Sequence, residues 1–254
     1  DLYAPHFIRD EEKYLSLFSK AQDEKRVGEA SVWYLCSKRA AAEIKEFCPS
    51  ARIIITLRNS VDMMYSLHGH RLYIGFEDII NFEDALAAEE DRKRGLRLPN
   101  NPHPIEGLFY RERAKYTQQV QRYLDIFGRE NIHIIIFDDF KSDTARVYRE
   151  TLRFLGVNED FQPDFKVINS SKRVHSKTLR NFLRSSTARL LGRGLMPYLL
   201  RQKFFKGLRR LNTKYEPRPP MDPELRRRLQ LEFLPEVEQL SKLLGRDLTH
   251  WCRP

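Results

Sequence analysis

RIIITLRNSVDMMYSLH, residues 52–68, is the stretch of sequence that decides the fold. Its β-branched apolar run, flanked by polar residues, predicts a buried strand. The run ends at Arg58-Asn59, and a helical pattern then begins with Asp62 in its first turn. We therefore expect Arg58 at the carboxyl end of a strand and Ser66 about two turns along the next helix.

Open α/β sheets bind ligands at this edge. A guanidinium and a hydroxyl placed there could both contact one phosphate, the arginine through a bidentate charge-assisted pair. The same residues also fit a helix-capping network beside a surface arginine. The spacing alone does not decide between the two interpretations.

The remaining pattern predicts an α/β fold in which a parallel β-sheet is flanked by helices. Further strands are predicted at Gly28–Leu35 and Asn131–Phe137. A charged lead-in over residues 1–26 is predicted to be helical, and a second helix is predicted to start after a Ser37 cap and to end at Phe47. Further helices are predicted over Phe82–Arg94, Tyr110–Phe127 and Ala145–Leu155, and from Pro223 onward. Alternating strands and helices indicate a parallel sheet. At 254 residues the chain fits one domain, residues 1–254.

The composition bounds the class of protein. The longest apolar runs are strand-sized, and no charged-then-apolar signal segment opens the chain. Three cysteines without metal-ligand spacing indicate reduced thiols, so we expect a cytoplasmic protein. His68 and His70 point to different helix faces, which argues against a zinc site.

The net charge of +10 is concentrated in one block. Residues 172–218 hold fourteen Lys and Arg against one acid, Glu216, which gives +13 and leaves −3 for the rest. Such a block predicts an anionic partner, although a solvated helical face has the same composition. We expect this region to be helical up to about Leu211.

Several blocks of the sequence resemble one family. RNSVDMMYS at residues 58–66 is similar to the RNPVDRAYS motif of sulfotransferases that use 3′-phosphoadenosine-5′-phosphosulfate (PAPS), particularly the heparan-sulfate-type and bacterial branch. GEASVWY at residues 28–34 resembles the family's GEKSxxY. The segments 134–155 and 212–222, and the ending that carries Trp251, resemble its later core strand and helix, its nucleotide-closing loop and its last helix.

The resemblance implies a P-loop-like sulfotransferase fold and transfer of a sulfuryl group from PAPS, without a metal, to a hydroxyl or amine acceptor, with carbohydrate- or lipid-like acceptors favoured. Arg58 and Ser66 would then hold the 3′-phosphate of the cosubstrate. Further nucleotide ligands would come from the basic block and from residues 212–220, which we expect to form a mobile lid. These ligands are Lys172, Arg173, Lys214 and Tyr215.

The candidate catalytic residues are His70, placed where related enzymes have a histidine near the sulfuryl group, and Glu29. An exposed helix histidine and an ion-paired strand-end carboxylate explain them equally simply. Likewise, Lys214 could be one more exposed lysine.

The chain also departs from the family. Ala30 stands where the family has a lysine, and nothing before Gly28 resembles the glycine-containing 5′-phosphosulfate loop. We therefore expect the first strand–loop–helix and the usual catalytic base to be missing through N-terminal truncation, with sulfuryl transfer near background.

A binding module is the alternative function. Leucines and arginines interleave over residues 189–209, a pattern that fits an amphipathic helix on an anionic membrane surface or another polyanion. Nucleic-acid binding is not expected, because no domain signature supports it. Elution from nucleotide-agarose by adenosine 3′,5′-bisphosphate would favour the enzyme, and retention on anionic liposomes alone would favour the module.

Overall fold

The computed structural model describes residues 7–100, 104–166, 172–176, 178–179, 204–205, 207–208 and 210–253. Contacts between Cα atoms divide the chain into two compact units. Unit 1 comprises Asp1–Met64, His103–Phe165 and Pro223–Pro254, and unit 2 comprises Tyr65–Pro102 and Lys166–Asp222. The boundary falls inside helix α3, Ser60–Ile74. The prediction of a single domain over 1–254 stays a prediction.

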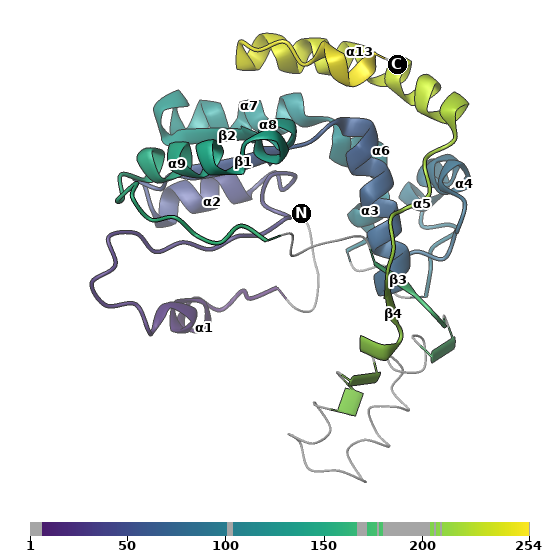
Figure 1. Cartoon of the computed structure of the whole chain (residues 1–254), viewed down its shortest axis with the longest axis horizontal. Helices are drawn as coiled ribbons and strands as arrows, with labels where there is room; N and C mark the ends of the chain where they lie inside the picture. The colour runs from purple at the N-terminus through teal and green to yellow at the C-terminus, as the bar shows by residue number, and fades with distance from the viewer. Residues whose placement is uncertain are drawn as a thin grey trace. The chain divides into compact units, whose positions relative to one another are not determined.

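Unit 1 is built on a parallel pair of strands, which confirms the predicted α/β class. β1 (Ile53–Leu57) pairs with β2 (Ile132–Ile136) from Ile53↔Ile132 to Leu57↔Ile136. The carboxyl ends of both strands therefore meet at one edge. Figure 1 shows four helices of this unit beside the two strands, namely α2 (Ala40–Phe47), α7 (Tyr116–Phe127), α8 (Phe137–Ser142) and α9 (Thr144–Leu155). The unit also contains α6 (Tyr110–Ala114) and α13 (Pro223–Leu244).

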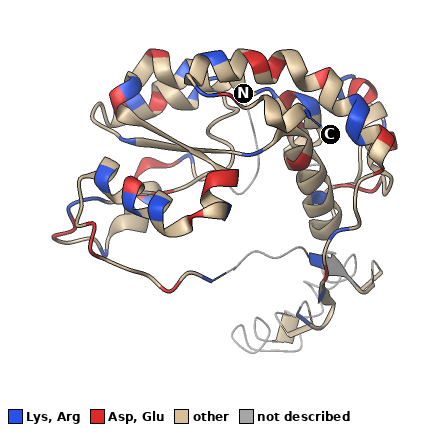
Figure 2. Cartoon of the chain, turned by 45° about the horizontal axis from the view of Figure 1, so that its top comes forward, with Lys and Arg blue, Asp and Glu red and all other residues tan. Residues whose placement is uncertain are grey.

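The core of unit 1 lies between the sheet and helices α7 and α13. Apolar side chains from β1, β2, α2, α7, α13 and the C-terminal turn form one buried cluster. Its largest member is Trp251, in the 3-10 turn η4 (Thr249–Cys252), which is 2% exposed. In Figure 2 acidic and basic positions are interspersed along the helices.

Three 3-10 turns complete unit 1, namely η1 (Ser16–Phe18), η2 (Ile105–Leu108) and η3 (Arg129–Asn131). Unit 2 contains α4 (Phe82–Ala87), α5 (Glu89–Lys93) and an antiparallel ribbon of β3 (Lys172–Val174) and β4 (Thr213–Tyr215). Glu77 and Arg92 form a bidentate ion pair in its interior at 2.7 and 2.8 Å, with both side chains 0% exposed.

Several predicted elements are wrong or shorter than expected. Residues 32–36 form turns instead of a strand, because Ser31 Oγ accepts a hydrogen bond from the Trp33 amide and Ser37 N–H donates back to Trp33 O. In the lead-in, only α1 (Glu11–Leu15) and η1 are helical among residues 7–26. Phe137, predicted as the end of a strand, begins helix α8, and residues 172–174, in the region predicted to be helical, form a strand.

Two long predicted helices are each interrupted. The first breaks at Ala88, between α4 and α5. The second breaks at Lys115, whose ψ of 87° is not helical. Gln119 Nε2 donates to Lys115 O at 2.8 Å, and the Thr117 amide donates to Glu236 Oε1 at 2.8 Å. These bonds satisfy the backbone groups that the break exposes.

Candidate functional site

The candidate site of unit 1 lies where β1 ends and α3 begins. Arg58 is the first residue after β1, and α3 starts two residues later at Ser60. Asn59 Oδ1 accepts hydrogen bonds from the amides of Val61 (3.0 Å) and Asp62 (3.3 Å), which caps the helix. The structure thus places Arg58 at the carboxyl edge of the sheet, as the sequence predicted.

The Arg58 guanidinium lies between an aromatic ring and a distant acid. Its Cζ lies 5.0 Å from the centroid of the Phe137 ring. Asp62 Oδ2 is 4.0 Å from its Nη2, whereas the other oxygen of Asp62 accepts from Arg226 at 2.7 Å. Because 37% of the Arg58 side chain is exposed, this cation is available to a dissolved anion.

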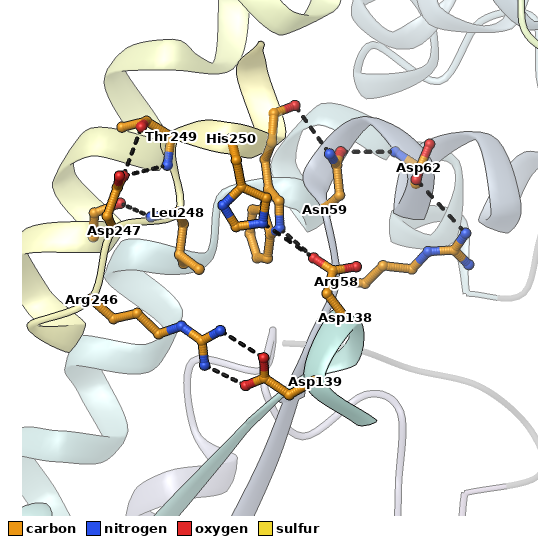
Figure 3. A network of polar contacts seen from close by, with 12 residues as sticks. Arg58, Asn59, Asp62, Asp138, Asp139, Arg246, Asp247, Leu248, Thr249 and His250 are labelled. Atoms are coloured by element: carbon orange, nitrogen blue, oxygen red, sulfur yellow. Dashed lines mark hydrogen bonds and ion pairs between the residues drawn. The ribbon is translucent and has the colours of Figure 1, made fainter. Parts of the chain in front are cut away.

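A polar network ties this corner to the C-terminal turn (Figure 3). Trp251 Nε1 donates to Asp138 Oδ2 at 2.7 Å, and Asn59 Nδ2 donates to Trp251 O at 3.0 Å. His250 Nε2 lies 3.5 Å from the same Asp138 oxygen. Sequence reasoning missed this network, since nothing local in the sequence relates Asn59 to a residue 192 positions later.

The neighbouring carboxylate, Asp139, is bound in the same way by a different partner. Arg246 Nη2 donates to Asp139 Oδ1 at 2.7 Å, and Arg246 Nη1 contacts the other oxygen. The hydrogen bonds from Arg246 hold the pKa of Asp139 below its usual value. Asp139 therefore stays ionised and paired at neutral pH.

Ser66, the other predicted 3′-phosphate ligand, lies in unit 2 under an arginine that we did not predict. Arg218 Nη2 is 3.4 Å from both Ser66 Oγ and Ser66 O, and its Cζ lies 5.1 Å from the Tyr65 ring centroid. A Cβ on Gly69 would come within 2.8 Å of Arg218 Nε. A glycine inside a helical pattern often marks such a close approach, and this signal could have revealed Arg218.

The β3–β4 ribbon pairs the backbones of the four other predicted nucleotide ligands. Lys172 pairs across the ribbon with Tyr215, and Arg173 with Lys214. Lys172 Nζ lies 5.7 Å from the Tyr215 ring centroid. Lys214 lies between Thr213 and Tyr215 on β4, so its side chain projects from the face opposite to theirs. There it forms an ion pair with Glu216.

Thr213 anchors the ribbon to α3 within unit 2. Tyr73 Oη and Thr213 Oγ1 are 2.9 Å apart, and Tyr65 Oη donates to Pro219 O at 3.0 Å. Two turns of α3 therefore hold the segment that we expect to act as a lid. The mobility of that segment stays a prediction.

The two predicted catalytic residues belong to different units. His70 is exposed by solvent-accessible surface, yet neighbouring atoms partly desolvate its ring. This desolvation, with the charges of Arg71, Lys172 and Arg218, lowers its pKa. Glu29, in unit 1, is exposed and hydrogen-bonded to Tyr34; burial and this bond raise the pKa of the Tyr34 hydroxyl. Their catalytic roles stay predictions.

Part of the predicted basic surface lies outside the described residues. This holds for Lys177, Arg180, Lys206, Arg209 and most of the amphipathic stretch 189–209. Nowhere in the described ranges is a helix long and apolar enough to cross a membrane. Within the same ranges, no group of three or more His, Cys, Asp or Glu side chains is placed to hold a metal ion.

Comparisons with known proteins agree on one family. The family model described as "Sulfotransferase domain" matches residues 42–238. The membrane-associated sulfotransferase kil1 of Dictyostelium discoideum is 29% identical over 111 residues, which covers 44% of this chain and 22% of that protein. The mouse bifunctional heparan sulfate N-deacetylase/N-sulfotransferase 4 is 26% identical over 232 residues, covering 89% of this chain and 23% of that protein.

This chain therefore spans less than a quarter of the length of these two curated relatives. Among solved structures, a sulfotransferase from Alicyclobacillus acidocaldarius superposes with a TM-score of 0.69 at 32% identity. That match covers 97% of this chain and 75% of the other.

Proposed function

Because this chain belongs to the sulfotransferase family, we propose that it transfers a sulfuryl group from PAPS to a hydroxyl or amine of an acceptor. The observation that carries the proposal is the position of Arg58. This guanidinium stands at the carboxyl edge of a parallel sheet, at the start of α3, and its closest acid contact is 4.0 Å away. A helix N-terminus and an arginine together favour a bound phosphate.

In the proposed reaction, the acceptor oxygen or nitrogen attacks the sulfur of PAPS in line with the leaving phosphate. The new bond to sulfur forms as the bond from sulfur to the 5′-phosphate oxygen breaks, and the acceptor proton passes to a base. Cations and oriented dipoles stabilise the charge that develops on the leaving phosphate. This chemistry needs nucleotide ligands, for which Arg58, Ser66, Lys172, Arg173, Lys214 and Tyr215 remain the candidates.

His70 is the candidate base in unit 2. Its lowered pKa keeps the imidazole neutral at physiological pH, and only the neutral form accepts a proton. The nearby cations Arg71, Lys172 and Arg218 contribute to that shift. The same cations would attract an anionic nucleotide, so the shift and the proposed ligand are consistent.

For the acceptor we propose a carbohydrate- or lipid-like hydroxyl or amine. The name of the mouse relative includes heparan sulfate, and that of the amoebal relative includes membrane association. Both names support a large glycan or a membrane-bound acceptor more than a small phenol. Peripheral contact with an anionic membrane is part of this proposal.

Two measurements test the proposal. Calorimetry should show that adenosine 3′,5′-bisphosphate binds more tightly than adenosine 5′-phosphate, because only the former carries the 3′-phosphate that Arg58 would hold. A screen with radiolabelled PAPS against glycan, glycolipid and phenolic acceptors should then identify the acceptor class. Equal affinity for the two nucleotides would contradict the assignment of the phosphate site.

A further inference from the structure

Three carboxylates surround the end of the sheet at which Arg58 lies, and each is bound by another donor. Asp62 accepts from Arg226, Asp138 from the Trp251 indole, and Asp139 from Arg246, all at 2.7 Å. Arg58 makes its closest ion-pair contact at 4.0 Å. The acids that could neutralise Arg58 are therefore directed to other partners.

Asp138 leaves the sheet next to Arg58. Leu57 and Ile136 are the last paired residues of β1 and β2, so Arg58 and Phe137 leave adjacent strand ends and Asp138 follows directly. Figure 3 shows the dashed contacts of Asp138 directed to the C-terminal turn, and the Arg58 side chain extending toward Asp62. A carboxylate released at this place would pair with the guanidinium and compete with an anionic ligand.

Trp251 is fixed at both ends, which suits it to hold Asp138. Its side chain is buried in the core, and its indole donates to Asp138. Its carbonyl oxygen accepts from Asn59 Nδ2 at 3.0 Å and from Gln230 Nε2 at 3.3 Å. Because Asn59 is the residue after Arg58, the C-terminal turn contacts both strand ends.

We propose that Trp251 is a positioning residue for anion binding: its indole N–H holds the Asp138 carboxylate so that Arg58 remains available to a ligand. The identity of the anion, the 3′-phosphate of the nucleotide, rests on the proposed function. The network itself does not, since its distances are independent of any ligand. Trp251 touches no reacting atom in this proposal and acts through Asp138 and Arg58.

The binding test compares three variants with the wild type by calorimetry of adenosine 3′,5′-bisphosphate. Trp251→Phe keeps the aromatic packing and removes the N–H donor, so we expect affinity to fall about two- to fivefold. Trp33→Phe removes the other indole of the chain, which lies over Arg113, and should change nothing.

The third variant decides the mechanism. Adding Asp138→Asn to Trp251→Phe removes the competing charge, so affinity should return to within about twofold of the wild type. A purely structural role of Trp251 predicts the opposite, because a second lesion in the same network would weaken binding further. Absence of this recovery would overturn the proposal.

A second measurement needs no nucleotide. Urea denaturation of Arg58→Gln, Asp138→Asn and the double variant gives the coupling between these side chains, first in the wild type and then in Trp251→Phe. We expect little coupling in the wild type and about a two- to fivefold coupling in the unfolding equilibrium constant in Trp251→Phe. Equal coupling in both backgrounds would refute the inference, whereas failure of the wild type to bind nucleotide would refute the proposed function alone.

Discussion

Each end of the parallel pair β1–β2 carries an arginine beside a phenylalanine ring, but the electrostatic surroundings of the two ends are opposite. At the amino end, Arg52 places its Cζ 5.5 Å from the centroid of the Phe154 ring, and at the carboxyl end Arg58 does the same with Phe137 at 5.0 Å. Arg52 lies near Gly156, which terminates α9, since a Cβ there would be 3.6 Å from its Nη1. Arg58 instead precedes the first turn of α3.

From the difference between the ends we expect Arg52 to stabilise the fold and Arg58 to bind a ligand. A helix C-terminus carries partial negative charge and favours a cation, so Arg52 already has a favourable partner. A helix N-terminus carries partial positive charge, so α3 adds to the charge of Arg58 instead of offsetting it. We therefore expect an anionic ligand at the carboxyl end and none at the amino end.

The largest expected effect tests how firmly the carboxyl end is built. Trp251→Ala removes a side chain that is 2% exposed and should lower the free energy of unfolding by about 3–5 kcal/mol. Phe154→Ala, at the amino end, removes a half-buried ring and should cost less. Urea denaturation measures both, and equal losses would show that the two ends do not differ in packing.

Nucleotide affinity gives the second largest contrast. Arg58→Ala should weaken binding of adenosine 3′,5′-bisphosphate by about 1.5–3 kcal/mol, roughly ten- to a hundredfold, through loss of a charge-assisted contact. Arg52→Ala is the matched control, because it removes an arginine stacked on phenylalanine from the other end of the same strand. Calorimetry should show no change in this control. Similar losses in both variants would indicate only a general effect of net charge.

The same two variants should rank in the opposite order when the free energy of unfolding is measured. Arg52→Ala removes a cation from the end of α9 and should lower the free energy of unfolding by about 0.3–1 kcal/mol. Arg58→Ala removes a cation beside the start of α3, so it should leave the stability unchanged or raise it. Urea denaturation without nucleotide checks both variants. A larger stability loss for Arg58→Ala would mean that this arginine serves the fold more than a ligand.

The sequence predicted those parts of the fold and site that depend on local pattern. The strand at 53–57, the helix from Ser60 and the glycine that ends α9 all follow from residues close together in the chain. The break at Lys115 does not follow from local pattern, because Glu236, far away in the sequence, accepts from the Thr117 amide that the break exposes. A turn held by Ser31 and Ser37 replaced the strand expected at Gly28–Leu35 for a similar reason.

The same distinction holds for the candidate site. Arg58 was predictable because a strand end and a helix start are adjacent in sequence. Asp138 and Trp251 were not assigned to it, since their partners lie 113 and 192 residues away. Pairings of this kind depend on the tertiary fold, and periodicity carries no information about them.

The smallest expected effect separates the two ends by pH. Burial lowers the pKa of His133, near the amino end of β2, below its ordinary value, so the unfolded chain binds a proton more readily than the folded one. Its contribution to stability is therefore complete above pH ~6.5 and is lost as the pH falls through that value. His133→Gln should make the unfolding free energy depend less on pH in this window than it does in the wild type. The pH dependence that His68 and His70 contribute should remain.

Asp139, at the carboxyl end, provides the comparison because its pKa is lowered by Arg246. A carboxyl group with a lowered pKa stabilises the fold above its unfolded value, about 3.8, and loses that contribution as the pH falls below it. Asp139→Asn should thus lower the unfolding free energy above pH ~5, where the wild type has the full contribution, keep the wild-type slope between pH ~5 and ~7, and remove part of the fall in acid. Denaturation series at stepped pH measure both variants. If His133→Gln and Asp139→Asn altered the slope in the same window, the charges at the two ends of the sheet would be coupled, and the contrast between them would fail.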